Sequence, residues 1–263
     1  MRSVYPSDIT REQFEAIRYH IDNISKKTRP PDYDIYDIFC AVLYIIREGC
    51  RWRSLPHDFP NWQNVYYHHS KWKKKRPNGS SILDDILEEL VLSERIINGR
   101  QAKPTMTIVD SKSVKNTFTA EEKGYDAGKK VSGIKIHLGT DTLGLPNCIN
   151  VTTADVTDRD GALEMLRKYA PKLASVLNVL CDGGYTGEKF ANAVMAIIEA
   201  TVEVVKRSEL HKFAVIPKRW IVERSLGWLD NFRRLWKNCE RKLHTTHQMV
   251  TLAFIFVLLK RRY

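Results

Sequence analysis

Residues 219–236 read RWIVERSLGWLDNFRRLW, and the rest of the sequence is best understood from this stretch. It predicts one amphipathic helix that begins directly after Pro217, because proline suits the first turn of a helix. At about 100° per residue, one face of this helix is mostly apolar and is the predicted core face. Its members are Ile221, Ser225, Trp228, Phe232, Leu235 and Trp236. Glu223 points away from that face, which by itself is typical of a solvated polar face with pairs between residues i and i+4.

Two earlier stretches give Glu223 a second interpretation. Residues 108–111 read IVDS and residues 179–185 read VLCDGGY, so an aspartate, Asp110 or Asp182, stops each apolar run. An aspartate at the end of a buried strand lies at the rim of a sheet, where ligands of open α/β sheets bind. Two such aspartates and a glutamate on an adjacent helix would place three carboxylates together, and these need a counter-charge such as a divalent cation. The pattern therefore indicates a magnesium site of the kind that serves two-metal phosphoryl transfer.

Charge and composition indicate a polyanionic partner. The 263 residues carry a formal charge of +11 and give a pI of about 9.4, which favours nucleic-acid binding. The alternative is a basic protein that has no such partner. Hydrophobic residues make up 43% of the chain, enough for a substantial core in one large domain or two ordinary ones.

Cysteine usage and hydropathy bear on the location of the protein. Five cysteines without a C-x-x-C pair favour reduced thiols, and thus a cytoplasmic protein, associated with the nucleoid if it binds DNA. The first residues lack the apolar run of a signal peptide. The longest apolar run, residues 249–259, is too short to span a bilayer and is predicted to be a core helix. We therefore expect no membrane-bound form.

The N-terminal third of the chain shows helical periodicity and almost no strand signal. Helices are predicted over residues 11–23, 34–47, 61–75 and 82–92. The third of these ends in a basic cluster of Lys71, Lys73, Lys74 and Lys75. Two helices joined by a short turn, the second one basic, suit a helix-turn-helix reader of DNA. A helical bundle with a solvated lysine face is an equally good interpretation.

Strand signals begin after residues 98–105, which form the predicted domain boundary. Strands are predicted over residues 105–110, 135–140, 147–153, 179–182 and 201–205, with helices over 158–169 and 187–199 and a loop over 121–130. Three strands, helix, strand, helix, strand and the Glu223 helix is the element order of an RNase H-like domain. The predicted fold class is therefore α+β, with an all-helical domain over residues 1–97 and an RNase H-like mixed-sheet α/β catalytic domain over residues 98–263.

Seven motifs along the chain resemble those of one protein family. They are GCRWRSLP at 49–56, WQNVY at 62–66, VDSKSVK at 109–115, DTLGLP at 141–146, DRDGA at 158–162, DGGYTG at 182–187 and RWIVER at 219–224. In this order, over nearly the full chain, they resemble bacterial insertion-sequence transposases of the DDE class. The resemblance implies an RNase H-like enzyme that cuts and joins double-stranded DNA at the terminal inverted repeats of a mobile element and in a target. It implies catalysis by Asp110, Asp182 and Glu223 with two Mg²⁺ ions, for which Mn²⁺ can substitute, and a homo-oligomer on DNA.

Basic residues near the glutamate match the family only in part. One related group carries Tyr, Arg and Lys around the Glu, and Arg219 matches the Arg as a residue that could hold a phosphate or orient Glu223. A structural ion pair with Glu223 is the alternative role for Arg219. The Tyr and Lys positions are Ile216 and Asp230 here, so the pattern is not met. Other candidates for DNA contact are Lys112, Lys115, Arg233, Arg234 and Lys237.

Two further functions are compatible with the sequence. One is a sequence-specific DNA-binding protein that has lost catalysis, and the presence of all three carboxylates counts against it. The other is a simple metal-dependent nuclease, which strand-transfer products would distinguish from a transposase.

Overall fold

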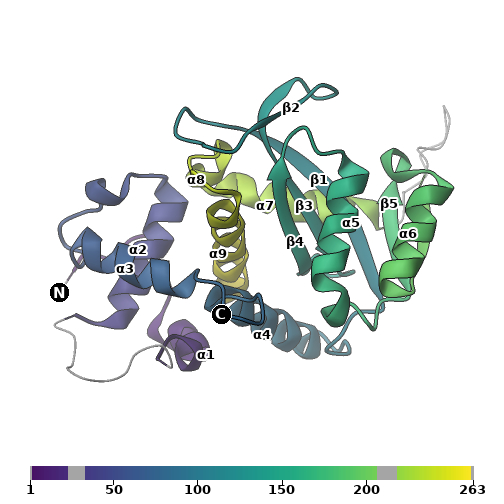
Figure 1. The fold of residues 1–263 in the computed structure, drawn as a ribbon. Helices are drawn as coiled ribbons and strands as arrows, with labels where there is room; N and C mark the ends of the chain where they lie inside the picture. Colours follow the sequence, from purple (N-terminus) through teal and green to yellow (C-terminus); the bar gives the residue numbers. More distant parts are fainter. Residues whose placement is uncertain (1, 23–32, 206–217, 262–263) are drawn as a thin grey trace, which may run out of the picture. The chain divides into compact units, whose positions relative to one another are not determined.

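The computed structural model describes residues 2–22, 33–205 and 218–261, apart from the side chain of Arg219 (Figure 1). The chain forms two compact units. The first consists of Met1–Leu90, Asp230–Trp236 and Gln248–Tyr263, and the second of Val91–Leu229 and Lys237–His247. The sequence places a single boundary at residues 97 and 98, whereas the chain leaves the first unit at Leu90 and returns to it twice.

The first unit is helical, as predicted. It contains α1 (Arg11–Asp22), α2 (Ile35–Glu48), a 3-10 turn (Trp52–Ser54), α3 (Trp62–Trp72), the start of α4 (Ile82–Ile97), α8 (Arg233–Trp236) and the end of α9 (Leu243–Arg261). Local capping sets several of these limits. The Thr10 hydroxyl accepts from the Gln13 amide at 3.1 Å while the Gln13 side chain accepts from the Thr10 amide at 2.8 Å, which is a capping box at the start of α1. Gly49, with a φ of 74°, ends α2 in the left-handed conformation.

The core of the first unit is made by α2, α3 and the C-terminal part of α9. Phe39 and Trp72 are fully buried, and their ring centroids lie 5.7 Å apart. Phe254 and Ile255 are also fully buried, which confirms the prediction of a core helix near the C-terminus. Burial of side chains of this size contributes about 1.5–3 kcal/mol each. Within the described ranges, no helix combines the length and apolarity that crossing a bilayer requires.

A buried histidine on α3 should make the first unit sensitive to acid. His69 is fully buried, its ring centroid lies 5.0 Å from that of Trp52, and its pKa is lowered to about 3 by burial and by the charges of Lys73 and Arg234. The unfolded chain binds a proton at this residue near pH ~6.5, well above the folded value, so stability is lost as the pH falls through this window. We expect His69→Phe, which keeps an aromatic ring beside Trp52, to flatten the pH dependence of the free energy of unfolding between about pH 4 and 6.5 by roughly one proton.

Urea unfolding at a series of pH values measures this slope. The exposed His57 gives the matched control, because His57→Phe makes the same substitution where no buried ring is involved. If the free energy of unfolding depends on pH equally in His69→Phe and in the wild type, protonation of the buried imidazole does not cause the loss of stability in acid.

The second unit is built on a six-stranded mixed sheet (Figure 1). Its strands are β1 (Met106–Lys115), β2 (Gly124–Asp126), β3 (Val131–Thr140), β4 (Pro146–Thr153), β5 (Asn178–Asp182) and β6 (Thr201–Val205). The order is β2-β3-β1-β5-β6, with β4 also paired to β3. The pairs β1–β3 and β3–β4 are antiparallel, whereas β1–β5 and β5–β6 are parallel. Apart from the short β2, this confirms the element order predicted for an RNase H-like domain.

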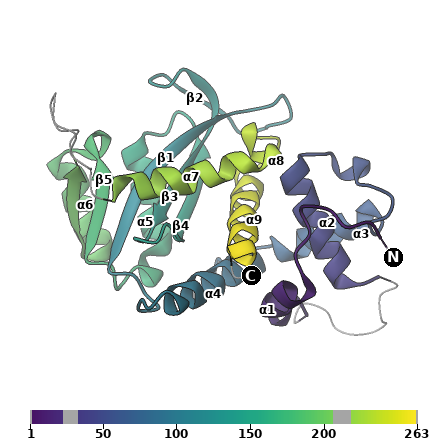
Figure 2. The ribbon, with the colours of Figure 1, turned by 180° about the vertical axis from the view of Figure 1, so that it is seen from behind.

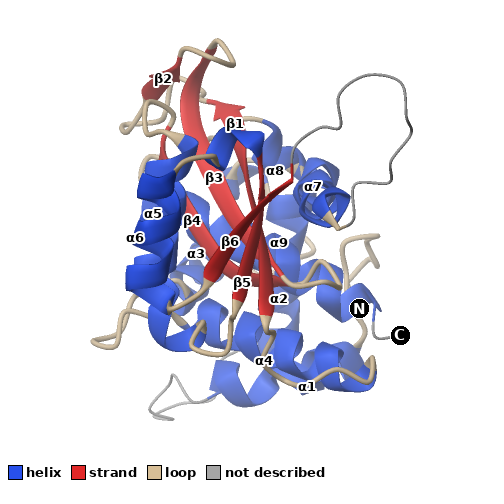
Figure 3. Ribbon diagram, turned by 90° about the vertical axis from the view of Figure 1, so that its right-hand side faces the viewer, coloured by secondary structure: helices blue, strands red, loops and turns tan. Residues whose placement is uncertain are grey.

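Helices cover both faces of this sheet. The helices α5 (Asp158–Tyr169) and α6 (Glu188–Ile198) lie on the face turned to the viewer in Figure 1, and α7 (Arg219–Trp228) lies on the face seen in Figure 2. Figure 3 shows the sheet edge-on between them. Val109, Val179 and Cys181 belong to the core under α5 and α6. Because side chains alternate along a strand, the residues next to them face α7.

Three predicted elements differ in the structure. The first strand does not end at Asp110 but runs to Lys115, because β3 continues to pair with it that far. The predicted loop 121–130 contains β2, which pairs antiparallel with the start of β3. The single helix predicted for 219–236 is wrong: α7 ends at Trp228, a 3-10 turn follows over Leu229–Asn231, and α8 starts anew. The break falls at Asp-Asn, residues that compete for backbone hydrogen bonds, and it leaves Trp236 59% exposed instead of buried.

Candidate active site

The strands β1 and β5 bring Asp110 and Asp182 to the same level of the sheet. Ile108 pairs with Leu180 in the parallel ladder, and each aspartate follows its paired residue by two positions. Residues two apart on a strand share a face, so both aspartates are on the face that α7 covers. The strand β5 ends at Asp182, whereas β1 continues beside β3. Asp110 therefore lies just beyond the last residue of β1 that pairs with β5.

The third carboxylate comes from α7, which packs against β1, β3 and β5. The residues after Glu223 fix this helix on the turn between β3 and β4. The Arg224 guanidinium donates to the Leu143 carbonyl at 2.9 Å, and the Ser225 hydroxyl donates to the Gly144 carbonyl at 2.8 Å. A Cβ at Gly144, whose φ is +83°, would come within 2.8 Å of both donors, so the turn requires glycine. The DTLGLP motif therefore positions the Glu223 helix, a role that sequence reasoning missed.

The three carboxylates share one electrostatic field. Burial raises the pKa of Asp110 to about 6, and the negative charges of Asp182 and Glu223 add to this rise. The Ser111 amide, 2.7 Å from Asp110 Oδ1, and the charge of Lys129 act in the opposite direction. Holding Asp110 ionised at neutral pH is therefore unfavourable without a nearby cation.

The donor set suits a hard divalent cation. Carboxylate oxygens are the ligands that Mg²⁺ prefers, and a bound cation would relieve the repulsion among the three groups. No three His, Cys, Asp or Glu side chains in the described part of the chain lie close enough together to hold a metal ion. Asp182 Oδ1 instead accepts a hydrogen bond from the Gly184 amide at 2.9 Å. The three carboxylates thus have the ligand type and the charge that suit Mg²⁺, but their side chains would have to move closer together to bind it.

Tyr185, in the same motif as Asp182, is buried beside the aspartates. Only 1% of it is exposed, and it packs with its ring centroid 5.4 Å from that of Phe190. Its pKa lies well above the ordinary value, because of burial first and then because of the negative charges of Asp110, Asp158 and Asp182. The phenol therefore stays neutral next to the carboxylates and adds no further negative charge. Sequence reasoning included Tyr185 in a motif without giving it a role.

The positive charge of Lys129 lowers the pKa of Asp110, and sequence reasoning missed this residue. Its ammonium lies 3.5 Å from the Ser111 carbonyl, and its backbone amide donates to the Asp126 side chain at 3.0 Å. No pattern marks it, because it lies in the segment predicted to be a loop. Arg219 begins α7 four residues before Glu223, but its side chain lies outside the described part, as does Ile216.

The other predicted DNA-contact residues are distributed over both units. Lys112 is on the same face of β1 as Asp110 and is half-buried, whereas Lys115 is exposed. Arg234 belongs to the first unit, where it donates to the Cys50 carbonyl at 2.9 Å and lies over the Trp52 ring. Arg233 pairs with Glu48 at 3.5 Å in the first unit, and Lys237 is exposed in the second. Asp230, at the position where the family pattern is not met, is exposed in the first unit.

Three lysines of the first unit line one pocket. The helix α3 ends at Trp72, three residues earlier than predicted, and the chain then turns toward Pro77. Lys71, Lys74 and Lys75 line a pocket of about 700 Å³ together with residues of α1 and α4. Lys73 caps the helix and does not line this pocket. Three of the four predicted lysines therefore share one basic concavity.

Comparisons with known proteins show which families the chain resembles. Residues 101–258 match the family described as transposase DDE domain, and residues 9–77 match the family described as putative transposase of the IS4/5 family. A curated relative, the putative transposase for insertion sequence element IS402 of Burkholderia cepacia, is 31% identical over 119 residues. The match covers 42% of this chain and 55% of the relative, so the chain spans about half the length of that protein.

Proposed function

The chain belongs to the transposase DDE domain family, and on that basis we propose that it cuts DNA at the ends of an insertion sequence and transfers the strands into a target. One observation supports this proposal most directly. Asp110 and Asp182 occupy equivalent positions on the adjacent parallel strands β1 and β5, and the helix that contains Glu223 packs against both strands. The negative charges of Asp182 and Glu223, which both raise the pKa of Asp110, support it. The reaction is hydrolysis of a phosphodiester followed by transesterification, both metal-dependent.

Each group in the site has a role in this chemistry. Asp110, Asp182 and Glu223 would hold two Mg²⁺ ions, with Mn²⁺ as a substitute. Such a pair, when bound, supplies activation of the attacking oxygen and stabilisation of the leaving oxygen. Lys129 offsets part of the negative charge at Asp110, and the neutral Tyr185 excludes water beneath the carboxylates. Arg219, one turn before Glu223, would hold a phosphate of the substrate or orient the glutamate.

The first unit is the proposed reader of the terminal inverted repeats. Its lysine-lined pocket offers a concentrated positive charge, and neutralised phosphates supply most of the affinity for DNA. The predicted helical DNA-binding domain over residues 1–97 overlaps this unit as far as Leu90, and the unit also includes Asp230–Trp236 and Gln248–Tyr263. Pairing two element ends would require a homo-oligomer on DNA, and a cytoplasmic protein of this charge would associate with the nucleoid.

One assay separates this proposal from its two alternatives. The purified protein is incubated with Mg²⁺, DNA that carries the flanking ends of its own element, and a circular target. Joined products identify a transposase, cleaved ends without joining identify a nuclease, and end-specific binding without cleavage identifies a protein that only binds DNA.

Removing two lysines from the basic pocket should weaken DNA binding in a salt-dependent way. Lys74 and Lys75 are exposed and line the pocket, so each is positioned to neutralise a phosphate. We expect the variant Lys74→Ala/Lys75→Ala to reduce the slope of log affinity against log salt by about two.

The control is Arg167→Ala/Lys189→Ala, which removes the same net charge from exposed positions on α5 and α6. Fluorescence anisotropy with end DNA over a range of salt concentrations gives the slopes. If the pocket variant and the control have equal slopes, the lysine cluster does not contact DNA.

A further inference from the structure

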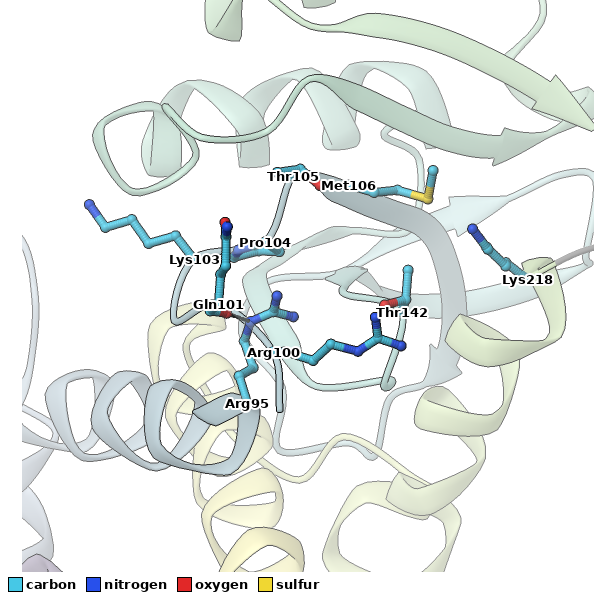
Figure 4. A pocket seen from close by; sticks show the side chains of 9 residues that line it. All are labelled: Arg95, Arg100, Gln101, Lys103, Pro104, Thr105, Met106, Thr142 and Lys218. Atoms are coloured by element: carbon cyan, nitrogen blue, oxygen red, sulfur yellow. Dashed lines mark hydrogen bonds between the residues drawn. The ribbon is translucent and has the colours of Figure 1, made fainter. Parts of the chain in front are cut away.

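A second basic pocket lies in the second unit, apart from the carboxylates. It has a volume of about 430 Å³ and is lined by four cations, Arg95, Arg100, Lys103 and Lys218, and by no acidic residue. Figure 4 shows that Arg95, Arg100 and Lys103 come from the end of α4 and the loop that follows it, whereas Lys218 directly precedes α7. The turn after β3 contributes Thr142 to the lining. None of the residues that line this pocket has a role in the reaction proposed above.

One of the four cations is a structural element and builds the wall of the pocket. Arg95 is 6% exposed and forms an ion pair with Asp141, which is 1% exposed. The same guanidinium donates from Nε to the Gln101 carbonyl at 2.8 Å, and the Arg100 amide donates to the Arg95 carbonyl at 2.9 Å. The loop that carries Arg100 is therefore fixed to a buried ion pair, and little conformational entropy remains to be lost when a ligand binds.

The other three cations leave the pocket strongly positive. Arg100, Lys103 and Lys218 are exposed, and they form no ion pair with any described residue. Thr105 and Thr142 add hydroxyl groups to the lining. Three uncompensated cations with hydroxyl donors and no carboxylate are the chemistry that binds phosphate oxygens.

The chain connects this pocket closely to the carboxylates. Met106, in the lining, is the first residue of β1 and lies four residues before Asp110, a distance of about 13 Å along the strand. Lys218 precedes Glu223 by five residues, about 7.5 Å along α7. The rise per nucleotide of one DNA strand is about 3.4 Å, so a strand cut at the carboxylates could reach the pocket within about four nucleotides.

We propose that the pocket of Arg95, Arg100, Lys103 and Lys218 binds backbone phosphates of the substrate DNA about four nucleotides from the cleaved bond. The proposal rests on the proposed function, because the register of the DNA is defined by cleavage at the carboxylates. Its contacts are to phosphates, so it holds the strand in register without selecting a base sequence.

The test compares Arg100→Ala/Lys103→Ala with the charge-matched control Arg167→Ala/Lys189→Ala in the 263-residue protein. We expect the pocket variant to bind end DNA about tenfold more weakly and with a salt slope reduced by about two, while the control keeps a slope near that of the wild type. In phosphate-ethylation interference, the wild type should lose binding when phosphates about four nucleotides from the cut are modified. The pocket variant should no longer respond to those modifications.

Failure of the pocket assignment and failure of the proposed function give different results. If cleavage and joining proceed but the pocket variant keeps the slope and interference pattern of the control, the pocket assignment is wrong and the proposed function stands. If the wild type shows no cleavage, the proposed function fails, and the salt slopes still decide whether the pocket contacts DNA. Equal thermal melting of the variant and the wild type establishes that the change lies in binding.

Discussion

Asp110→Asn is expected to abolish cleavage of element ends while the protein still folds and binds DNA. The substitution keeps the shape of the side chain and the acceptor for the Ser111 amide, but it removes the charge that two metal ions would share. Loss of several kcal/mol of transition-state stabilisation corresponds to a fall in cleavage rate of about 10³-fold or more. The affinity for end DNA, assigned mainly to the first unit, should change less than about threefold. A change of this size is typical of the loss of a single exposed charge interaction. Parallel binding and cleavage assays with the same end DNA measure both quantities.

The same variant should be more stable than the wild type in the absence of metal. The folded pKa of Asp110, about 6, exceeds its ordinary value of 3.8, so the folded protein binds more protons between these values and loses stability as the pH rises through them. Asparagine removes this penalty, which amounts to about 1–3 kcal/mol above pH ~6 and vanishes below pH ~4. Mg²⁺ should raise the melting temperature of the wild type and not that of the variant.

The exposed Asp155 provides the control, because Asp155→Asn makes the same isosteric change without entering the carboxylate field. It should leave cleavage, metal-free stability and the Mg²⁺ effect as they are in the wild type. Cleavage by Asp110→Asn at a rate near that of the wild type would rule out Asp110 as a shared ligand, and the two-metal proposal would fail with it.

The sequence predicts the fold and the paired aspartates because both depend on local patterns. The two apolar runs end in Asp110 and Asp182, and parallel pairing of Ile108 with Leu180 places these residues side by side once the strands are adjacent. The same periodicity identified the helices, whose limits were mostly correct to within a few residues because residues such as Gln13 and Gly49 cap them.

Features that depend on tertiary contacts could not be predicted. The helix at 219–236 carries a continuous amphipathic pattern, but its two parts belong to different compact units and the pattern does not show the break between them. Lys129 acts on Asp110 from a segment that is nineteen positions away in sequence and has no periodicity of its own. The position of Glu223 depends on hydrogen bonds from Arg224 and Ser225 to the turn after β3, which no local signal reveals.

Asp141→Ala is expected to destabilise the second unit strongly. Asp141 pairs with Arg95 where both are nearly inaccessible, and it also accepts hydrogen bonds from the Leu143 and Leu145 amides at 2.8 and 2.9 Å. Alanine would leave a buried guanidinium without a counter-charge and two amides without an acceptor. Breaking a buried pair in this way costs about 3–5 kcal/mol, equivalent to a fall in melting temperature of about 6–20 °C for a chain of this size.

Two comparisons show whether the buried charge causes this loss. The exposed pair of Arg18 and Glu15 is the control, because Glu15→Ala breaks an ion pair at the surface and should cost less than about 1 kcal/mol. In the second comparison, Arg95→Met/Asp141→Leu removes both charges, and we expect it to recover much of the stability that Asp141→Ala loses, because no uncompensated charge remains. Urea unfolding of the four proteins gives the free energies. The double variant restores the charge balance but not the carboxylate that accepts from the Leu143 and Leu145 amides. If it is as unstable as Asp141→Ala, these hydrogen bonds to the turn, rather than the ion pair, hold this part of the fold together.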